Sequence, residues 1–142
     1  MERYKILYED QDVLVIHKYP GLAVQSARSM TPDLVSMLRN RALEQGEAKP
    51  YLGLVNRLDQ PVEGLLVFAK DKKAAAALSK QLTEGALNKH YYAVLCGYPD
   101  CPEGDLVDYL RKEGNMALAV TGREQEFADA KIAALHYRIL EE

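Results

Sequence analysis

The chain has 142 residues, 48% of them hydrophobic, which is enough to bury the core of one domain and excludes a disordered tail or a mini-protein. No apolar run approaches the roughly 20 residues that a membrane-spanning helix needs, and the first residues lack the layout of a signal peptide. A cytoplasmic protein without a membrane partner is therefore expected. The net charge of −3 argues against a protein that holds nucleic acid by charge alone.

The charge is unevenly distributed along the chain. Residues 57–89 carry six basic and four acidic side chains, whereas residues 100–142 carry five basic and ten acidic ones. This distribution permits a polyanion to bind on one face, although solvated helix and loop charges explain it equally well. The two cysteines, Cys96 and Cys101, lack CxxC spacing and histidines at metal-ligand spacing, so we interpret them as structural thiols and expect no metal.

Short apolar runs in the first third of the chain predict strands at residues 4–8, 13–17 and 22–25. A helix is expected next, because Thr31-Pro32-Asp33 offers an N-cap threonine, a proline at the first helical position and an acid in the first turn. Its apolar residues follow at four-residue spacing as far as Gly46, and they are Leu34, Leu38 and Ala42.

The remainder continues the alternation of strands and helices. Residues 52–55 and 65–69 are expected to be strands, and Asp71 can cap a second helix whose apolar face ends near Gly85. Further strands are expected at residues 91–96, 116–120 and 130–140. Strands thus outnumber helices, and the connections are short. The pattern predicts an α+β domain with a mixed, largely antiparallel sheet and two main helices.

The segment Asn56-Arg57-Leu58-Asp59 places a cation and a carboxylate at a strand end. Because strand side chains alternate, Leu58 is expected to point into the core and Arg57 and Asp59 to the opposite side. A fixed carboxylate there can act as a nucleophile or a base, and the guanidinium can hold a phosphate or stack on a base. The alternative is an ordinary Arg/Asp pair, which the spacing alone favours.

Two further segments are candidates. In Lys89-His90-Tyr91-Tyr92 a cation leads into an expected strand with two tyrosines on opposite faces, one of which can stack on a planar ligand. Aromatic residues also favour strands for packing reasons alone. In His17-Lys18-Tyr19-Pro20-Gly21, a loop that ends a strand, Lys18 is expected to be solvated.

Three segments in this order resemble the catalytic core of the RluA-type RNA pseudouridine synthases. VLVIHKYPGLAVQ, residues 13–25, is similar to the family's strand, Lys-Pro-x-Gly loop and second strand. Asn56-Arg57-Leu58-Asp59, with Gly64 opening an apolar strand, is similar to its His-Arg-Leu-Asp sequence and the glycine that follows. Lys89-His90-Tyr91-Tyr92-Ala93 is similar to its Lys-x-Tyr-x-Ala strand. The resemblance extends from about Ile6 to Leu140.

The resemblance implies the family's catalytic-core fold and the isomerisation of uridine to pseudouridine in a structured RNA (rRNA or tRNA), with neither metal nor organic cofactor. It implies that Asp59 attacks the target uridine and that Arg57 helps to extrude and replace the flipped nucleotide. Tyr91 would stack on the uracil and assist proton removal at C5. Asn56 and Lys89 are expected to contact the substrate.

The sequence departs from the family's pattern in several places. Asn56 stands where the family usually has histidine, Val62-Glu63 replaces the usual Thr-Ser, and the proline-glycine loop is shifted. The family's later strand, whose arginine pairs with the catalytic aspartate, should follow Leu140, so residues 1–142 are expected to be a catalytic domain truncated at its C-terminus. Two alternatives remain open: a catalytically idle RNA-binding or interaction domain on the same scaffold, and a small-molecule hydrolase that uses Asp59.

Overall fold

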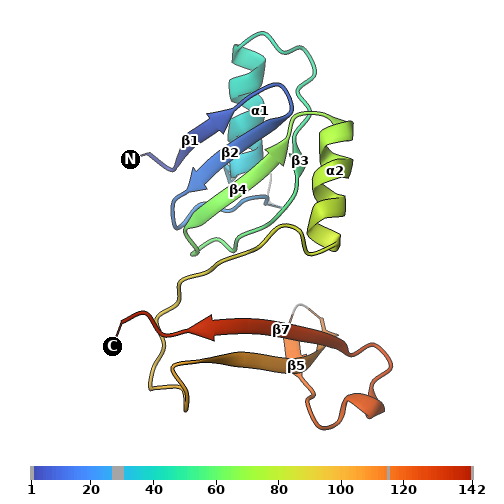
Figure 1. Ribbon diagram of the computed structural model, residues 1–142. Coiled ribbons are helices and arrows are strands. Elements are labelled where there is room, and N and C mark those ends of the chain that lie inside the picture. The colour runs from blue at the N-terminus through green and yellow to red at the C-terminus, as the bar shows by residue number, and fades with distance from the viewer. Residues whose placement is uncertain (1, 27–30, 115, 142) are drawn as a thin grey trace. The chain divides into compact units, whose positions relative to one another are not determined.

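The computed structural model describes residues 2–26, 31–114 and 116–141 (Figure 1). The chain divides into two compact units, Met1–His90 and Tyr91–Glu142, and each unit has its own antiparallel sheet. The first unit contains β1 (Tyr4–Glu9), β2 (Val13–Lys18), α1 (Leu34–Glu44), β3 (Gly53–Leu54), β4 (Gly64–Ala69) and α2 (Lys72–Thr83). The second contains β5 (Glu103–Glu113), β6 (Met116–Ala119), a short 3-10 helix (Glu124–Glu126) and β7 (Lys131–Arg138).

The sheet of the first unit has the strand order β1-β2-β4-β3, with every neighbouring pair antiparallel. In its centre, Leu14 of β2 lies opposite Phe68 of β4, and Ile16 lies opposite Leu66. Because side chains alternate along each strand, these four residues share one face of the sheet. The register therefore forms a continuous apolar surface at the middle of the unit.

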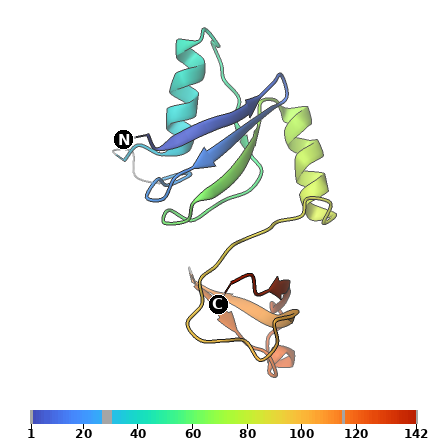
Figure 2. The same ribbon diagram turned by 60° about the vertical axis from the view of Figure 1, so that its left-hand side comes forward.

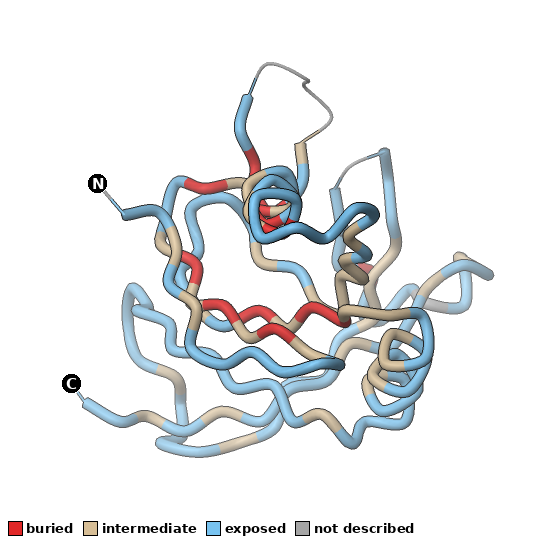
Figure 3. The backbone as a smooth tube through the Cα atoms, turned by 90° about the horizontal axis from the view of Figure 1, so that it is seen from above, coloured by how far each residue is buried: buried red, intermediate tan, exposed pale blue. Residues whose placement is uncertain are grey.

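Helix α1 and the segment before it complete the core on that surface. Leu34 and Leu38 pack there, together with Leu22 and Val24, and all four are buried. In Figure 3 the buried positions along β2, β4 and α1 are red. The four-residue spacing in the sequence thus predicted the buried face of α1 correctly.

The start of α1 differs from the expectation. Asp33, and not Thr31, is the N-cap, and its carboxylate accepts hydrogen bonds from the backbone N–H groups of Ser36 and Ser26, both at 2.7 Å. The expected strand at residues 22–25 was also wrong. In this segment the backbone carbonyls of Ala23 and Val24 accept hydrogen bonds from the first two N–H groups of α1, at 2.9 and 3.1 Å. These bonds satisfy donors that the start of a helix leaves unpaired.

Helix α2 begins as predicted. The Asp71 carboxylate accepts from the backbone N–H of Ala74 at 2.8 Å, so it is the N-cap. The helix packs against β3 and β4, at one side of the sheet (Figure 2). Gly53 allows the close approach, because a Cβ atom there would lie only 3.1 Å from the Cβ of Ala75.

The sheet of the second unit has the order β6-β5-β7 and differs from the first in burial. Among the residues described in this unit, Val120 alone is buried, and apolar side chains such as Leu106, Ile132 and Leu135 are more than half exposed. The expected strand at residues 91–96 was wrong, because these residues are in no strand. A strand requires a hydrogen-bonding partner, and the described part of the chain supplies none for this segment.

The expected α+β class, with antiparallel pairing and two main helices, is confirmed. The long strand β5 was missed, since its charged residues interrupt the apolar pattern. Over the described ranges, no helix has both the length and the apolar character that crossing a bilayer requires.

Candidate active site

The predicted catalytic residues Arg57 and Asp59 lie in the loop at residues 55–63, which connects β3 to β4. Asn56 anchors the start of this loop. Its side-chain amide donates to the Leu65 carbonyl at 3.3 Å, and its side-chain oxygen accepts from the Val67 N–H at 3.1 Å. The asparagine side chain therefore continues the short β3–β4 ladder and holds the loop against the edge of β4.

The middle of the loop shows the predicted alternation of side chains. Leu58 is half-buried and packs against the core, whereas Arg57 and Asp59 are exposed. Gly64 allows this packing, because a Cβ atom there would lie 3.2 Å from Cδ1 of Leu58 and its φ of +154° disfavours other residues. The loop thus buries one side chain and presents a cation and a carboxylate to solvent.

Arg57 and Asp59 are not paired with each other. Within residues 2–26, 31–114 and 116–141, neither side chain takes part in a hydrogen bond or an ion pair. In the described residues, the two side chains therefore do not neutralise each other, and the alternative of an Arg/Asp pair without a function stays open. A carboxylate and a guanidinium in this state both retain their full hydrogen-bonding capacity for a ligand.

The end of the loop is held by the segment that follows β2. The Gln60 carbonyl accepts from the Gly21 N–H at 2.8 Å and from Lys18 Nζ at 3.1 Å, while the Gln60 side-chain amide donates to the Gly21 carbonyl at 3.0 Å. Lys18 Nζ also donates to the Tyr19 carbonyl at 3.2 Å. Residues 18–21 and Gln60, the neighbour of Asp59, are thus joined by several hydrogen bonds.

Lys18 is fully buried, with 0% of its surface exposed, so the expectation that it is solvated was wrong. Burial lowers the pKa of Lys18, and the nearby Glu63 carboxylate partly opposes this effect. Glu63 also lies 2.9 Å from Nε2 of His17. Lys18 and Gln60 are the two residues of this region that the sequence analysis did not assign to the site.

The other two predicted site residues lie at the boundary between the units. Lys89 is exposed near the end of the first unit, and Tyr91 is 65% exposed at the start of the second. Asp59 belongs to the first unit, so its expected proximity to Tyr91 stays a prediction. The exposed ring of Tyr91 offers a flat surface on which a base can stack.

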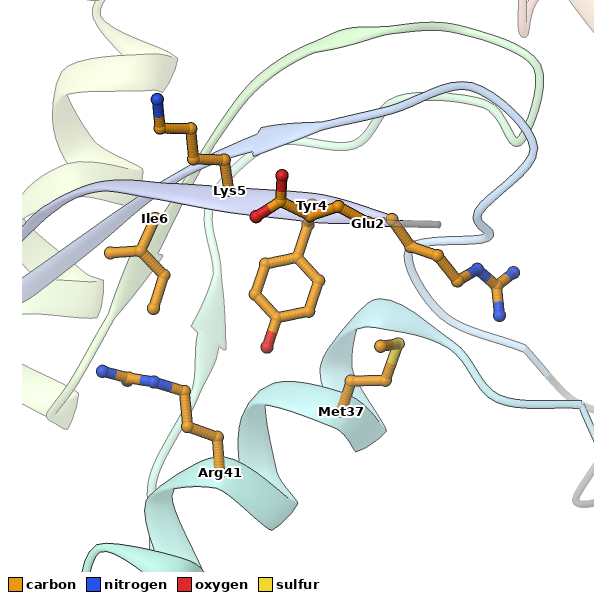
Figure 4. A pocket seen from close by; sticks show the side chains of 7 residues that line it. Glu2, Tyr4, Lys5, Ile6, Met37 and Arg41 are labelled. Carbon is orange, nitrogen blue, oxygen red and sulfur yellow. The ribbon is translucent and has the colours of Figure 1, made fainter.

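A surface hollow lies elsewhere in the first unit, between β1 and α1 (Figure 4). The Tyr4 ring extends from β1 towards α1, from which Met37 and Arg41 project. None of the predicted site residues lines this hollow. In the described residues there is also no group of three or more His, Cys, Asp or Glu side chains that could hold a metal ion.

The chain that carries this anchored loop, with its exposed arginine and aspartate, matches the model of a known protein family. The model for RNA pseudouridylate synthase matches residues 12–142, and the chain therefore belongs to this family. Its relatives place it among the RluA-type members. It is 36% identical over 100 residues, 70% of the chain, to the dual-specificity RNA pseudouridine synthase RluA of Vibrio vulnificus.

Two other relatives match almost the whole chain. Ribosomal large subunit pseudouridine synthase D of Nitrosomonas europaea is 31% identical and the uncharacterized RNA pseudouridine synthase YlyB of Bacillus subtilis is 32% identical, each over 96% of the chain. The chain spans 38% of the length of the Vibrio and Nitrosomonas proteins and 45% of the Bacillus protein.

Solved structures show the same fold. Human RNA Pseudouridylate Synthase Domain Containing 4 superposes with a TM-score of 0.70, at 22% identity, over 94% of this chain and 52% of that one. Human RNA Pseudouridylate Synthase Domain Containing 1 gives 0.71, at 19% identity, over 94% of this chain and 50% of that one. The predicted catalytic-core fold is therefore confirmed.

Proposed function

We propose that the protein containing this chain is an RNA pseudouridine synthase, which isomerises uridine to pseudouridine in a structured RNA. The observation that carries the proposal is the exposed carboxylate of Asp59, which has no partner among the described side chains and follows Arg57 on an anchored loop in a chain of this family. Ribosomal RNA is the favoured substrate over tRNA, because relatives from Nitrosomonas europaea and Zymomonas mobilis are named for the large ribosomal subunit. The cytoplasm is the proposed compartment.

The reaction requires cleavage of the bond from N1 of uracil to C1′ of the ribose, rotation of the uracil, and bond formation through C5. Asp59 is the proposed nucleophile, since an exposed carboxylate can reach a flipped nucleotide. A base must leave its stack before an enzyme can act on it, and Arg57 is proposed to hold the place that it leaves. These steps need neither metal nor organic cofactor.

The remaining predicted residues have supporting roles in the proposal. Tyr91 is proposed to stack on the uracil and to assist proton removal at C5, and exposed Lys89 to contact RNA phosphates. Asn56 was predicted to contact the substrate. Because its amide group is hydrogen-bonded to β4, we propose that it serves the substrate by holding the loop of Arg57 and Asp59. Residues 1–142 are proposed to form part of one catalytic domain.

Replacing Asp59 by the isosteric Asn tests the proposal. The full-length protein is incubated with ribosomal RNA carrying tritium at C5 of uridine, and tritium release is measured. The expected loss in turnover is on the order of a thousandfold or more, because the nucleophile is removed. The matched control is Asp12→Asn, which changes another exposed aspartate of the same unit and should leave turnover unchanged. Wild-type turnover by Asp59→Asn would refute the mechanism, and an inactive wild-type protein would favour the idle scaffold.

A further inference from the structure

Helix α2 has an apolar face and a lysine face. Its half-buried residues form the apolar face, and they are Ala74, Ala75, Leu78 and Leu82. Successive residues of a helix are about 100° apart, which places Lys72, Lys73 and Lys80 on the opposite side. All three are exposed. We call these three residues the lysine face of α2.

The positive charge of the lysine face is almost uncompensated. The 12 residues of α2 include three lysines and neither Asp nor Glu, although the whole chain has 21 acidic and 18 basic residues. Among the described residues, no carboxylate lies within ion-pair distance of Lys72 or Lys73. Lys80 Nζ lies 3.7 Å from the Glu84 carboxylate, but both side chains are more than half exposed, and an exposed pair of this kind contributes little. The lysine face therefore remains available to an anion.

The stability of the helix does not explain the lysines at its start. Lys72 and Lys73 are the first two residues after the N-cap Asp71. The amino end of a helix carries a partial positive charge, so cations in the first turn are unfavourable. Within Lys72–Thr83 no residue is fully buried, so packing does little to offset this effect. A surface that serves solubility alone mixes both signs of charge. An anionic partner, in contrast, accounts for all three lysines.

Helix α2 extends along the first unit towards the loop of Asp59. The helix begins shortly after Ala69, the last residue of β4, and runs back along the sheet towards the end where β4 begins (Figures 1 and 2). The loop at residues 55–63 enters β4 at that end. A helix of 12 residues is about 18 Å long. A nucleic acid strand, which has a phosphate at every nucleotide, can therefore place several phosphates along the helix.

We propose that the lysine face of α2 binds the phosphate backbone of the RNA whose uridine reaches Asp59. The inference rests on the proposed function and adds a contact surface outside the catalytic loop. RNA is favoured over an acidic protein, because the chain belongs to the RNA pseudouridylate synthase family. An ammonium group binds phosphate as a point charge, so these contacts position the RNA without reading its bases.

The test variant is Lys72→Gln/Lys73→Gln/Lys80→Gln in the full-length protein. A fluorescein-labelled transcript of large-subunit ribosomal RNA is titrated with the protein at about 50 to 200 mM KCl, the range over which phosphate contacts weaken strongly. Each lost contact should reduce the slope of the logarithm of the association constant against the logarithm of salt concentration by about 0.7–0.9, so the slope should fall by about 2. At the lowest salt concentration, Kd should rise about tenfold or more.

The matched control is Lys5→Gln/Arg39→Gln/Lys49→Gln. It removes three exposed cations from the same unit, none of them on α2. Its net charge change equals that of the test variant, and we expect its slope to stay within about 0.5 of the wild-type value. An unchanged slope in the test variant would overturn the inference. Equal reductions in the two variants would do the same, because they would reflect net charge alone.

Stability and turnover provide two further readouts. The thermal unfolding temperature of the test variant should stay the same or rise, because two cations leave the start of α2. Weaker binding with a lower unfolding temperature would indicate a structural role and overturn the inference. At saturating RNA we expect kcat within about twofold of wild type and a raised KM, since the lysines do not touch the reacting atoms.

The binding assay also separates this inference from the proposed function. If the wild-type protein makes no pseudouridine while the slope still falls in the test variant alone, the proposed reaction fails and the RNA-binding face is supported. If the wild-type protein is active and the test variant keeps its slope, the inference fails alone. A wild-type protein that does not bind the transcript would overturn both.

Discussion

Asp59 has an exposed side chain on a backbone that is held in place, and these two properties are difficult to obtain together. Its neighbours on both sides are held, Leu58 by the core and Gln60 by hydrogen bonds to residues 18–21. The carboxylate itself remains exposed. In the proposed mechanism, the order that the nucleophile requires would therefore come from the core and from residues 18–21.

Tyr91 provides a test of base stacking that does not depend on turnover. We expect Tyr91→Phe to bind RNA nearly as well as the wild-type protein, because the ring remains. Tyr91→Ala should lose about 1–3 kcal/mol of binding free energy, the usual contribution of stacking one base. The measurement is a fluorescence titration of the full-length protein with RNA. Tyr92→Ala is the control, since Tyr92 is the adjacent exposed tyrosine. Equal losses from Phe and Ala at position 91 would contradict a stacking role.

Asp33 is the residue on which the start of α1 depends. Burial alone raises the pKa of the Asp33 carboxyl, but hydrogen bonds from the backbone N–H groups of Ser36 and Ser26 outweigh this effect and hold the pKa below its usual range. We expect Asp33→Ala to lower the free energy of unfolding by about 1–3 kcal/mol, because both N–H groups lose their acceptor. Asp33→Asn, which keeps one oxygen acceptor, should lose less in urea unfolding. Equal losses would mean that the cap hydrogen bonds contribute little.

Strands β5 and β7 hold a pH-sensitive contact. His136 lies opposite Asp105 in the register; its Nδ1 is 2.9 Å from that carboxylate and its Nε2 is 3.0 Å from the Glu103 carboxylate. Hydrogen bonds to Asp105 first, and then to Glu103, raise the pKa of the His136 imidazole.

A raised pKa in the folded state means that the contact stabilises the protein fully below the unfolded pKa of about 6.5 and loses this effect as pH rises through the folded value. We expect the imidazole midpoint of His136, followed by NMR, to fall in Asp105→Asn. Replacing His136 by Asn should remove the corresponding part of the pH dependence of unfolding. If the titration midpoint of His136 does not move in Asp105→Asn, the hydrogen bond to Asp105 is not the cause of the raised pKa.

The helices were largely predictable from sequence, whereas two strand assignments failed for a common reason. Helix signals are local: the spacing of Leu34 and Leu38 and the cap at Asp71 act within a few residues. A strand depends on a partner that the local sequence does not reveal. Residues 91–96 have a strand-like composition without a described partner, and residues 22–25 bond to α1 instead.

Lys18 shows a signal that was present in the sequence and overlooked. Leu14, Ile16 and Lys18 follow one another at two-residue steps and are all buried, as side chains on one face of a strand should be. The alternation therefore predicts that Lys18 points towards the core. The expectation of a solvated side chain rested on its being a lysine. Its position on the buried face of β2 outweighs that preference.

The distribution of buried side chains differs between the two units. The buried apolar cluster lies in the first unit, and the second exposes most of its apolar side chains. We expect the backbone amides of β2 and β4 to exchange with solvent far more slowly than those of β5 and β7, because opening the second sheet exposes little additional apolar surface. Native-state hydrogen exchange of the full-length protein measures this. Equal protection in both sheets would show that the second sheet is buried in the complete protein.

The candidate site was predictable where it depends on one segment. Arg57 and Asp59 are exposed and Leu58 is half-buried against the core, as the alternation predicts, but these residues lie in a loop and not in a strand. The bond between Lys18 and Gln60 joins residues 42 positions apart, and no local pattern identifies it. The same is true of the expected meeting of Tyr91 and Asp59, which stays a prediction.

Both thiols of the chain, at Cys96 and Cys101, are free, exposed and in the second unit. A maleimide-linked fluorophore or spin label should therefore attach to that unit without any engineered residue. The first unit contains no cysteine, so a single one introduced beside Asp59 would give a donor–acceptor pair that measures the distance between the two units. The same two sulfur atoms allow copies of the protein to cross-link in air, and preparations therefore need a reductant.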